Sequence, residues 1–433
     1  MKRAVLEQAP RVLDRPDHRI SRRDIDPNTL KVLYRLHNAG RTAYLVGGAV
    51  RDLLLGRAPK DFDVGTDAGP SEIRRLFRNS RIIGRRFRLV HVLYPEGVVE
   101  VSTFRRTPDP EQQDGDPEDR LITSDNTFGT PREDAFRRDF TINALFYDIG
   151  DFSVIDYCGG IDDLEAKVVR AIGDPDLRFQ EDPVRMVRAC EFAARLGFTI
   201  EPATALAIER NRREIEKASP ARLTEEVVGL LRSGHAADAC QVMLEFGLLE
   251  SILPEAFAMV TAEARGLGRF NRIPLVLDEM AREERETSDA SLLAAVLLPS
   301  VLLRRYDVEA VAGRPLSRPQ LEQMAREVVT PFLQRLKISA LRTQEILGSL
   351  VAFFRLCEPA WKPGARARYG ATRHFDGALF LFELLVRATG EGDDVLALWR
   401  EASENRPEAV VESAEEGDRP GRPRRRRRRR RRV

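Results

Sequence analysis

The sequence predicts an α+β protein whose head carries a small mixed sheet, followed by all-α neck and body regions. Two patterns predict this architecture. Short strand-like apolar stretches separated by turn signals occur only within about residues 22–155. From about residue 160 to 396, apolar residues recur at helical spacing instead. A third stretch, 401–433, has low complexity and is expected to be a disordered, basic tail.

The chain of 433 residues is long enough for about two to four domains. The expected parts are an N-terminal lead (1–21), the head (22–155), the neck (156–250), the body (251–400) and the tail (401–433). The lead is expected to be exposed. In the neck, the apolar spacing predicts helices at 183–196, 203–217, 222–232 and 235–246.

Within the head, a helix is expected from Pro27 to about Ala39, with Gly40 after its end. The expected strands are Ala43–Val46, Phe62–Gly65, Ile82–Ile83, Leu89–Tyr94 and Val98–Phe104. The last two flank Pro95-Glu96-Gly97, a hairpin signal. Short helices are expected at Val50–Leu55 and Ser71–Arg78, and the polar stretch 106–134 reads as a long loop.

The net charge of +2 hides strong local imbalances. Residues 419–433 contain eleven Arg and no acid, whereas 401–418 contain seven acids and one Arg. Residues 70–106 contain nine Arg and three acids. The local charges, rather than the total, therefore bear on what the protein binds.

Several classes of protein are excluded by composition. No apolar run reaches the roughly 18 residues of a membrane span, and the N-terminus lacks the apolar core of a secretory signal. The cysteines are at least 32 residues apart, which favours neither a disulfide framework nor a zinc site. They are Cys158, Cys190, Cys240 and Cys357. We therefore expect a cytoplasmic protein.

The first chemical pattern joins a glycine turn to paired carboxylates. Gly47 and Gly48 stand between an expected strand and helix, where they let backbone N–H groups approach a phosphate. Ten residues after Arg51, Asp61 and Asp63 are spaced i,i+2 on an expected strand, so both carboxylates project from one face. They repel each other unless a cation lies between them, and Mg²⁺ takes one or two carboxylates together with phosphate oxygens. Two such ions activate an attacking hydroxyl and hold a leaving pyrophosphate. Alone, the carboxylate pair is more typical of an exposed turn; the glycine element beside it favours a site.

Two further blocks carry charge beside apolar residues. In Arg137-Arg138-Asp139, Asp139 either completes a carboxylate triad or accepts from a ribose hydroxyl, and an arginine holds phosphate; the alternative is a charge cluster at a helix end. Glu100 is another candidate third carboxylate, or simply an exposed side chain.

In the block Glu181–Arg188, Asp182 is a good N-cap before Pro183. Arg185 and Arg188 share one helix face. These forked side chains suit reading a base edge, whereas helix capping beside a solvated basic stripe is the alternative.

Together these blocks resemble the class II nucleotidyltransferases of the polymerase β superfamily, which comprise bacterial poly(A) polymerases and CCA-adding tRNA nucleotidyltransferases. The resemblance runs from about His18 to Leu249, and more weakly to about residue 390. Three features are most similar to the poly(A) polymerase I group. They are the basic stretch Ile83–Val92, the lead His18–Arg22 and the arginine tail.

The resemblance implies a polymerase β-like head and a set of site residues. Asp61 and Asp63 match the magnesium ligands, and Asp139 matches a third catalytic aspartate or a ribose contact. The nucleotide-binding candidates are Gly47, Gly48, Arg51, Arg138, Asp182, Arg185 and Arg188. One position departs from the family pattern: Glu191 stands where an arginine is usual, and it is expected to pair with Arg195.

The implied activity is the template-independent addition of AMP from ATP to RNA 3′ ends, with Mg²⁺, in a two-metal site, and with release of pyrophosphate. Alternatives are a CCA-adding or partial C- or A-adding tRNA nucleotidyltransferase and, from another class, a non-catalytic RNA-binding protein. Proteins of RNA decay are possible partners through the tail or body. The candidate RNA contacts are Arg85, Arg86, Arg88, Arg424, Arg425 and Arg426.

Overall fold

A computed structural model of the chain describes residues 9–84, 88–107, 127–255, 272–283, 286–358 and 361–405. The chain divides into two compact units, Met1–Glu286 with Phe332–Ile338, and Thr287–Pro331 with Ser339–Val433. The predicted head and neck both lie in the first unit. Residues 108–126 of the predicted loop and 406–433 of the predicted tail lie outside the described ranges.

The head is built on one mixed sheet, as predicted, but with eight strands. Its spatial order is β1 (Arg11–Leu13), β8 (Val154–Asp156), β7 (Leu145–Asp148), β2 (Ala43–Val46), β3 (Asp63–Thr66), β6 (Gly97–Thr103), β5 (Leu89–Tyr94) and β4 (Ser80–Ile83). Strands β3 and β6 are parallel, and every other neighbouring pair is antiparallel. The parallel pair places Val64 beside Val101, so the start of β3 meets the middle of β6.

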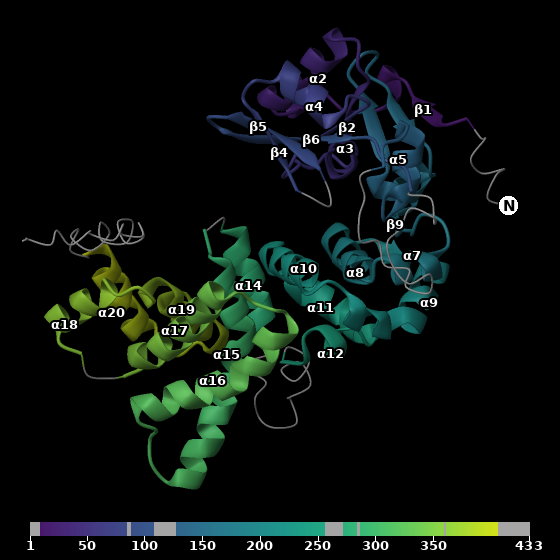
Figure 1. Cartoon of the computed structure of the whole chain (residues 1–433). Coiled ribbons are helices and arrows are strands. Elements are labelled where there is room, and N and C mark those ends of the chain that lie inside the picture. Colours follow the sequence, from purple (N-terminus) through teal and green to yellow (C-terminus); the bar gives the residue numbers. More distant parts are fainter. Residues whose placement is uncertain are drawn as a thin grey trace, which may run out of the picture. The chain divides into compact units, whose positions relative to one another are not determined.

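Short helices cover the sheet and begin at well-defined caps. Helix α2 (Pro27–Asn38) packs against β2, β3 and β6 through buried Val32, Leu33 and Leu36 (Figure 1). Asp26 caps it by accepting a hydrogen bond from the Thr29 N–H at 2.7 Å. The other helices of the head are α3 (Gly48–Leu54), α4 (Pro70–Leu76) and α5 (Pro131–Arg137).

Three strands of the head sheet were not expected from the sequence. The lead is predicted to be exposed, yet its residues Arg11–Leu13 pair with β8 as the edge strand of the sheet, and its Ile20 is buried. Strands β7 and β8 were also missed. A strand of only three residues, such as β1, is too short to show an alternation of apolar and polar residues. Its pairing partner also lies more than 140 residues away along the chain, so no local signal indicates the pairing.

The rest of the first unit is mainly helical. Its helices are α6 (Gly160–Ala166), α7 (Pro175–Glu181), α8 (Val184–Leu196), α9 (Pro202–Asn211), α10 (Pro220–Arg232), α11 (Ala236–Glu245), α12 (Leu249–Ile252) and α14 (Ile273–Arg282). The predicted all-α neck also contains a small parallel sheet of β9 (Val168–Val169) and β10 (Thr199–Ile200). Helix α8 contacts α7, α10 and α11, which makes it the central element of the neck (Figure 1).

The second unit is entirely helical within its described residues. Its helices are α15 (Asp289–Ala312), most of α16 (Arg318–Arg335), α17 (Ala340–Leu356), α18 (Pro363–Gly370), α19 (Phe375–Thr389) and α20 (Asp393–Glu404). The fully buried Glu383 accepts from Arg387 at 2.7 Å and pairs with Arg400 at 2.8 Å. None of the helices in the described ranges combines the length and apolar character that a membrane crossing requires.

Candidate active site

One cavity of about 800 Å³ in the first unit brings the predicted site residues together. Its walls come from residues at the ends of the central strands β2 and β3 of the head sheet and from α8 and α10. It contains all ten of the predicted catalytic and nucleotide-binding residues: Gly47, Gly48, Arg51, Asp61, Asp63, Arg138, Asp139, Asp182, Arg185 and Arg188. These residues come from three sequence blocks that span about 140 positions, so the fold, rather than proximity along the chain, assembles them.

The glycine turn joins β2 to α3 in a conformation that requires glycine. Gly47 has a φ of +70°, a backbone conformation that residues other than glycine rarely adopt. A Cβ atom at this position would also lie 2.8 Å from Nη1 of Arg138. The Gly47 N–H donates to the Leu145 carbonyl at 3.0 Å, which fixes the turn to β7. The turn is therefore both tight and held in place beside Arg138.

Asp63 is the first residue of β3, Asp61 lies two residues before it, and both line the cavity. Asp63 pairs in register with Val46, the last residue of β2 before the glycine turn. Although Asp63 is open to the cavity, desolvation by the surrounding walls, together with the negative charges of Glu100 and Asp61, raises its pKa to about 6, and Arg138 opposes this rise. Within the described ranges neither aspartate has an ion-pair partner.

This arrangement fits a divalent cation. Two nearby carboxylates without a counter-charge repel each other, and a cation between them removes that repulsion. No group of three or more His, Cys, Asp or Glu side chains among the described residues forms a complete metal cage. Mg²⁺ does not need one, because it binds through one or two carboxylates plus phosphate oxygens and water.

Asp139 is a carboxylate of a different kind. Its oxygens accept from the Phe140 N–H at 2.8 Å, from Asn143 at 3.0 Å and from Nε of Arg188 at 2.8 Å. Burial alone would raise the pKa of this carboxyl, but Arg188 and the hydrogen bonds outweigh burial and hold the pKa at about 2. Asp139 does not join Asp61 and Asp63 in one metal-binding group, so its position favours the ribose-contact or positioning role over the triad.

Glu100 is the carboxylate next to the pair. The parallel register of β3 and β6 brings it beside Asp63, whose pKa it raises. Its own side chain is about half exposed and lies 3.2 Å from Nε2 of His91 on β5. Glu100 does not line the cavity as described. Of the two candidate third carboxylates, it is the one that acts electrostatically on Asp63.

Two arginines tie the head wall together. Arg51, only 3% exposed, donates to both carboxylate oxygens of Asp52 at 2.8 and 2.9 Å and also to Asn143. Arg138 donates to Asp134 at 3.0 Å and to the Asn143 carbonyl at 3.3 Å. Both guanidinium groups line the cavity with their orientation fixed by these partners.

The Asp182 cap prediction is wrong. Helix α8 begins at Val184, and no side chain caps it. The Asp182 carboxylate instead accepts from Arg222 of α10 at 2.8 Å. Arg185 donates to the Arg178 carbonyl at 3.0 Å and lies 3.4 Å from Glu181. Asp182 therefore lines the cavity with its carboxylate held by Arg222. As an N-cap, the carboxylate would instead be bonded to the backbone of its own helix.

Phe192 on α8 is the centre of an arginine cluster. The guanidinium carbons of Arg51, Arg188 and Arg195 lie 5.1, 5.1 and 5.3 Å from its ring centroid. The predicted pair of Glu191 with Arg195 is confirmed, at 2.7 Å. Glu191 therefore faces the cavity as the partner of an arginine one turn further along the helix.

Sequence reasoning missed several residues of this cavity. Lys60, Asn143, Phe192, Arg222 and Glu226 also line it. Asn143 links Arg51 to Asp139, and its place in the Arg138–Asn143 segment is the one signal that pointed to it. Arg222 and Glu226 are spaced i,i+4 on α10, a pattern that any solvated helix face shows.

The predicted RNA contacts are only partly described. Arg85, Arg86, Arg424, Arg425 and Arg426 lie outside the described residues. Arg88 precedes β5, and its carbonyl accepts from Arg105 at 3.0 Å. Their contact with RNA stays a prediction.

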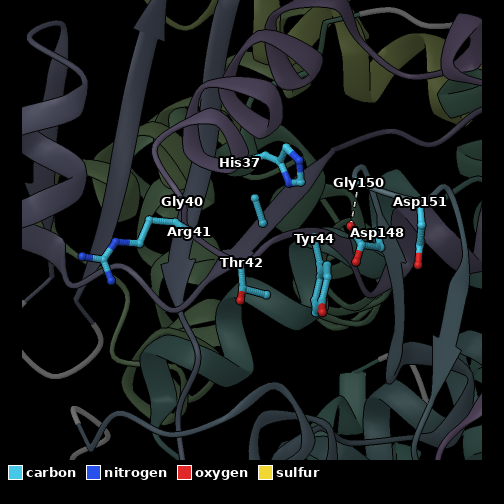
Figure 2. Close-up of a pocket in the computed structure, with 9 residues that line it drawn as sticks. His37, Gly40, Arg41, Thr42, Tyr44, Asp148, Gly150 and Asp151 are labelled. Atoms are coloured by element: carbon cyan, nitrogen blue, oxygen red, sulfur yellow. Dashed lines mark hydrogen bonds between the residues drawn. The ribbon is translucent and has the colours of Figure 1, made fainter.

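A second concavity of about 450 Å³ lies between α2 and the β7–β8 turn (Figure 2). Figure 2 shows His37 above Asp148 and Gly150, with Tyr44 beside them. Its acids serve local structure: Asp148 accepts from the Gly150 N–H at 2.7 Å, and Asp151 accepts from the Ser153 N–H at 2.9 Å. This pocket is therefore explained by the turn itself.

Comparison with known proteins places the chain in a family. A family model described as the poly A polymerase head domain matches residues 43–170, and one described as a probable RNA and SrmB-binding site of polymerase A matches residues 197–259. Poly(A) polymerase I of Haemophilus influenzae is 36% identical over 329 residues, which cover 72% of this chain and 72% of that protein. The chain belongs to the bacterial poly(A) polymerase I family.

Other relatives extend this result. Poly(A) polymerase I of Salmonella typhi is 45% identical over 303 residues, or 68% of this chain, and that of Escherichia coli O157:H7 is 48% identical over 262 residues, or 58% of this chain. The chain spans 65% and 55% of the lengths of these two relatives. Among solved structures, the Bacillus stearothermophilus CCA-adding enzyme in complex with CTP is 26% identical, with a TM-score of 0.56 over 87% of this chain and 82% of that chain. The predicted nucleotidyltransferase head and helical remainder are confirmed.

Proposed function

We propose that the protein adds AMP from ATP to the 3′ ends of RNA without a template and releases pyrophosphate. The observation that carries this proposal is the cavity in which two unpaired carboxylates, Asp61 and Asp63, face a wall of fixed arginines. Membership of the poly(A) polymerase I family and the match of residues 197–259 to an RNA-binding region support ATP and RNA as substrates.

Asp61 and Asp63 would hold Mg²⁺ at the start of β3. When bound, the metal supplies charge neutralisation at the reacting phosphate and lowers the pKa of an attacking hydroxyl. The protein's own part is to hold both carboxylates at the cavity without a counter-charge of their own, so that a cation is favoured between them. Fixed donors cost no reorganisation during reaction, so catalysis of this kind depends mainly on positioning.

The phosphate side of the site is assigned to the glycine turn and Arg138. Gly47 and Gly48 let a phosphate approach the backbone without a side chain in the way. Arg138 lies directly beside the turn, and Asp134 fixes its orientation. A triphosphate at this position would meet a guanidinium that is already oriented, next to the two metal-holding carboxylates.

The base and ribose side is assigned to the α8 wall. Asp139 and Arg188 form a part-buried ion pair, and Asp182 and Arg185 lie on the same wall. Hydrogen bonds with fixed directions distinguish base edges, because a wrong base leaves buried donors and acceptors unpaired. The fixed partners of these side chains support a role in nucleotide selection.

CCA addition is the second candidate, favoured by a specific observation. The solved CCA-adding structure with CTP covers 87% of this chain, and the CCA-adding enzyme of Lactobacillus johnsonii is 40% identical over 52% of it. In sequence, poly(A) polymerase I relatives match a longer stretch than this CCA-adding relative does, 68% to 72% of this chain against 52%. This longer sequence match favours polyadenylation.

One assay separates these functions. The protein is incubated with Mg²⁺ and either a generic RNA or a tRNA that lacks CCA, with ATP or CTP supplied singly and together. Long A-tracts on the generic RNA are expected with ATP alone. Short additions confined to tRNA, with CTP used, would support the CCA-adding alternative, and no extension would support a non-catalytic RNA-binding protein. The predicted cytoplasmic location and contacts with RNA-decay proteins stay predictions.

A further inference from the structure

A third cavity, of about 360 Å³, lies on the head between the lead, α2 and the β7–β8 turn. It contains three arginines, Arg15, Arg22 and Arg23, and no carboxylate among its described lining residues. The remaining walls are partly aromatic. They are formed by Ser21, Leu30, Tyr34, Tyr147 and Phe152. The cavity is therefore basic and has no neutralising group of its own.

The arginines of this cavity differ from those of the candidate active site. There, six arginines each lie within 3.4 Å of a carboxylate; they are Arg51, Arg138, Arg185, Arg188, Arg195 and Arg222. In the third cavity, Arg15 donates to the His18 carbonyl at 3.1 Å and Arg22 to the Tyr34 hydroxyl at 2.7 Å. The guanidinium of Arg23 has no partner within the described part of the chain. The three guanidinium groups that line this cavity thus have no ion pair with a carboxylate within the described residues.

The cavity is also preorganised. Arg22 stacks over the Phe152 ring, 4.5 Å from its centroid. Phe152 itself has φ +66°, a left-handed conformation that is strained for a residue with a side chain. His18 holds it there, since its Nδ1 accepts from the Ile20 N–H at 3.2 Å and its Nε2 donates to the Phe152 carbonyl at 2.8 Å. The lead and the turn are therefore locked together with the arginines on their surface.

The cavity wall also contains a tyrosine hydroxyl. Tyr147 is a buried residue, and its hydroxyl makes no hydrogen bond within the described ranges. The residue lines the same cavity as the three arginines. A phosphate in the cavity would accept hydrogen bonds from this hydroxyl and from the guanidinium groups.

We propose that this cavity is a second RNA-binding site, which holds phosphates of the RNA strand away from the reacting 3′ end. Guanidinium groups match phosphate geometry, and aromatic side chains interleaved with arginine are typical of surfaces that bind single-stranded nucleic acid. That the ligand is RNA rests on the proposed function. The site itself is separate, because it shares no residue with the cavity that contains Asp61 and Asp63.

The test uses the full chain and the double variant R22S/R23S. Its matched control is R11S/R41S, which removes two arginines outside the cavity, each paired with a carboxylate (Arg11 with Asp162, Arg41 with Glu72). Affinity for a single-stranded RNA of about 30 nucleotides is measured against salt. Losing two phosphate contacts should flatten the log–log salt slope by about 1.4 and weaken binding about tenfold at physiological salt, whereas the control should stay within about twofold of wild type.

Further readouts keep the outcome decisive. Extension of a primer of about six nucleotides by ATP should be reduced much less in R22S/R23S than extension of the 30-nucleotide RNA, because a short primer offers few phosphates beyond its reacting end. If the double variant unfolds, R23S alone replaces it in the binding measurement, because this substitution breaks no described side-chain hydrogen bond. R22K/R23K, which keeps both positive charges, should restore much of the salt slope.

Unchanged affinity for the long RNA, or an equal loss in the control, would overturn the proposal. The proposal would also be overturned if AMP or inorganic phosphate displaced the RNA and bound with an affinity equal to that of RNA. That result would make the cavity a site for free nucleotides. If the wild-type protein binds RNA through these arginines but extends nothing, the proposed function fails and the second site stands.

Discussion

The two sides of the candidate active site treat their carboxylates in opposite ways. At the start of β3, Asp61 and Asp63 have no ion-pair partner within the described ranges, and their surroundings raise the pKa of Asp63 to about 6. On the α8 side, Asp139 is paired with Arg188, and its pKa is held at about 2. Both sides are acidic in sequence, but only the β3 side is left short of positive charge. The proposed cation site is therefore at β3, and we propose that the α8 side, whose carboxylate already has its counter-charge, positions its groups for the nucleotide.

Removing the unpaired carboxylates should have the largest effect. In D61N/D63N, ATP incorporation is expected to fall by at least about 10³-fold, because the charge that holds the metal and the reacting phosphate is lost. Stability should be unchanged or higher, since two like charges are removed. RNA affinity should stay within about twofold of wild type. The measurement is single-turnover extension together with urea unfolding, and substantial residual activity would contradict the metal assignment.

The glycine turn follows Val46, which pairs with Asp63, and lies beside Arg138, so it should be next in importance. G47A forces a side chain into a φ +70° position and within 2.8 Å of Arg138. We expect a stability loss of about 1–3 kcal/mol and about a tenfold to 100-fold loss of activity, because Arg138 must move. G97A, in a hairpin with open space around it, is the matched control. Equal effects of the two substitutions would show that the turn has no special role.

Breaking the α8 pair should cost stability as well as activity. In D139N, Arg188, whose side chain is about one-third exposed, loses a carboxylate, and the free energy of unfolding at neutral pH should fall by about 1–3 kcal/mol. The wild-type carboxyl has a lower pKa folded than unfolded, so its contribution of about 2 kcal/mol is full above about pH 4 and is lost as the pH falls toward 2. Urea unfolding between pH 2 and 7 should show a shallower acid limb in D139N. An unchanged limb would mean that Arg188 does not stabilise the charged form.

Nucleotide selection should respond to Asp182 with a moderate effect. D182A removes a carboxylate that Arg222 holds in place, and we expect the preference for ATP over CTP to fall about tenfold. R222Q should give a smaller change in the same direction, because the carboxylate remains but is no longer fixed. The ratio of kcat/KM for the two nucleotides measures both. A uniform loss with both nucleotides would assign Asp182 to positioning rather than to base reading.

Glu191 should have the smallest effect. It pairs with Arg195 at 2.7 Å in the cavity wall. E191Q weakens that pair, and the KM for ATP should change by less than about fivefold with kcat retained, since part-exposed pairs contribute little. A large fall in kcat would show that Glu191 acts at the reacting atoms.

Sequence reasoning reached the residues of the site better than their partners. The glycine turn and the Asp61–Asp63 pair are visible in short segments, because local geometry dictates those residue types. The partner of Asp182 is 40 residues away on α10, and no local pattern distinguishes Arg222 from other surface arginines. A cap was the natural local interpretation of Asp182, and a long-range ion pair overrode it.

The fold shows the same limit. Strands Ala43–Val46 and Leu89–Tyr94 were predicted with correct bounds, since their apolar residues and flanking turns are local signals. Strands β1, β7 and β8 were missed, although they add three strands to the sheet. Tyr147, on β7, and the lead also build the basic third cavity. The parts that depend on distant strand pairing are thus those that the sequence did not reveal.

The most direct test of the contrast between the two sides is to count bound Mn²⁺, a substitute for Mg²⁺, by electron paramagnetic resonance in the presence of ATP. Wild type and D139N are predicted to bind the same number of ions, while D61N/D63N loses tight binding. Loss of the metal in D139N, or its retention in D61N/D63N, would contradict the assignment of the cation to the unpaired carboxylates of β3.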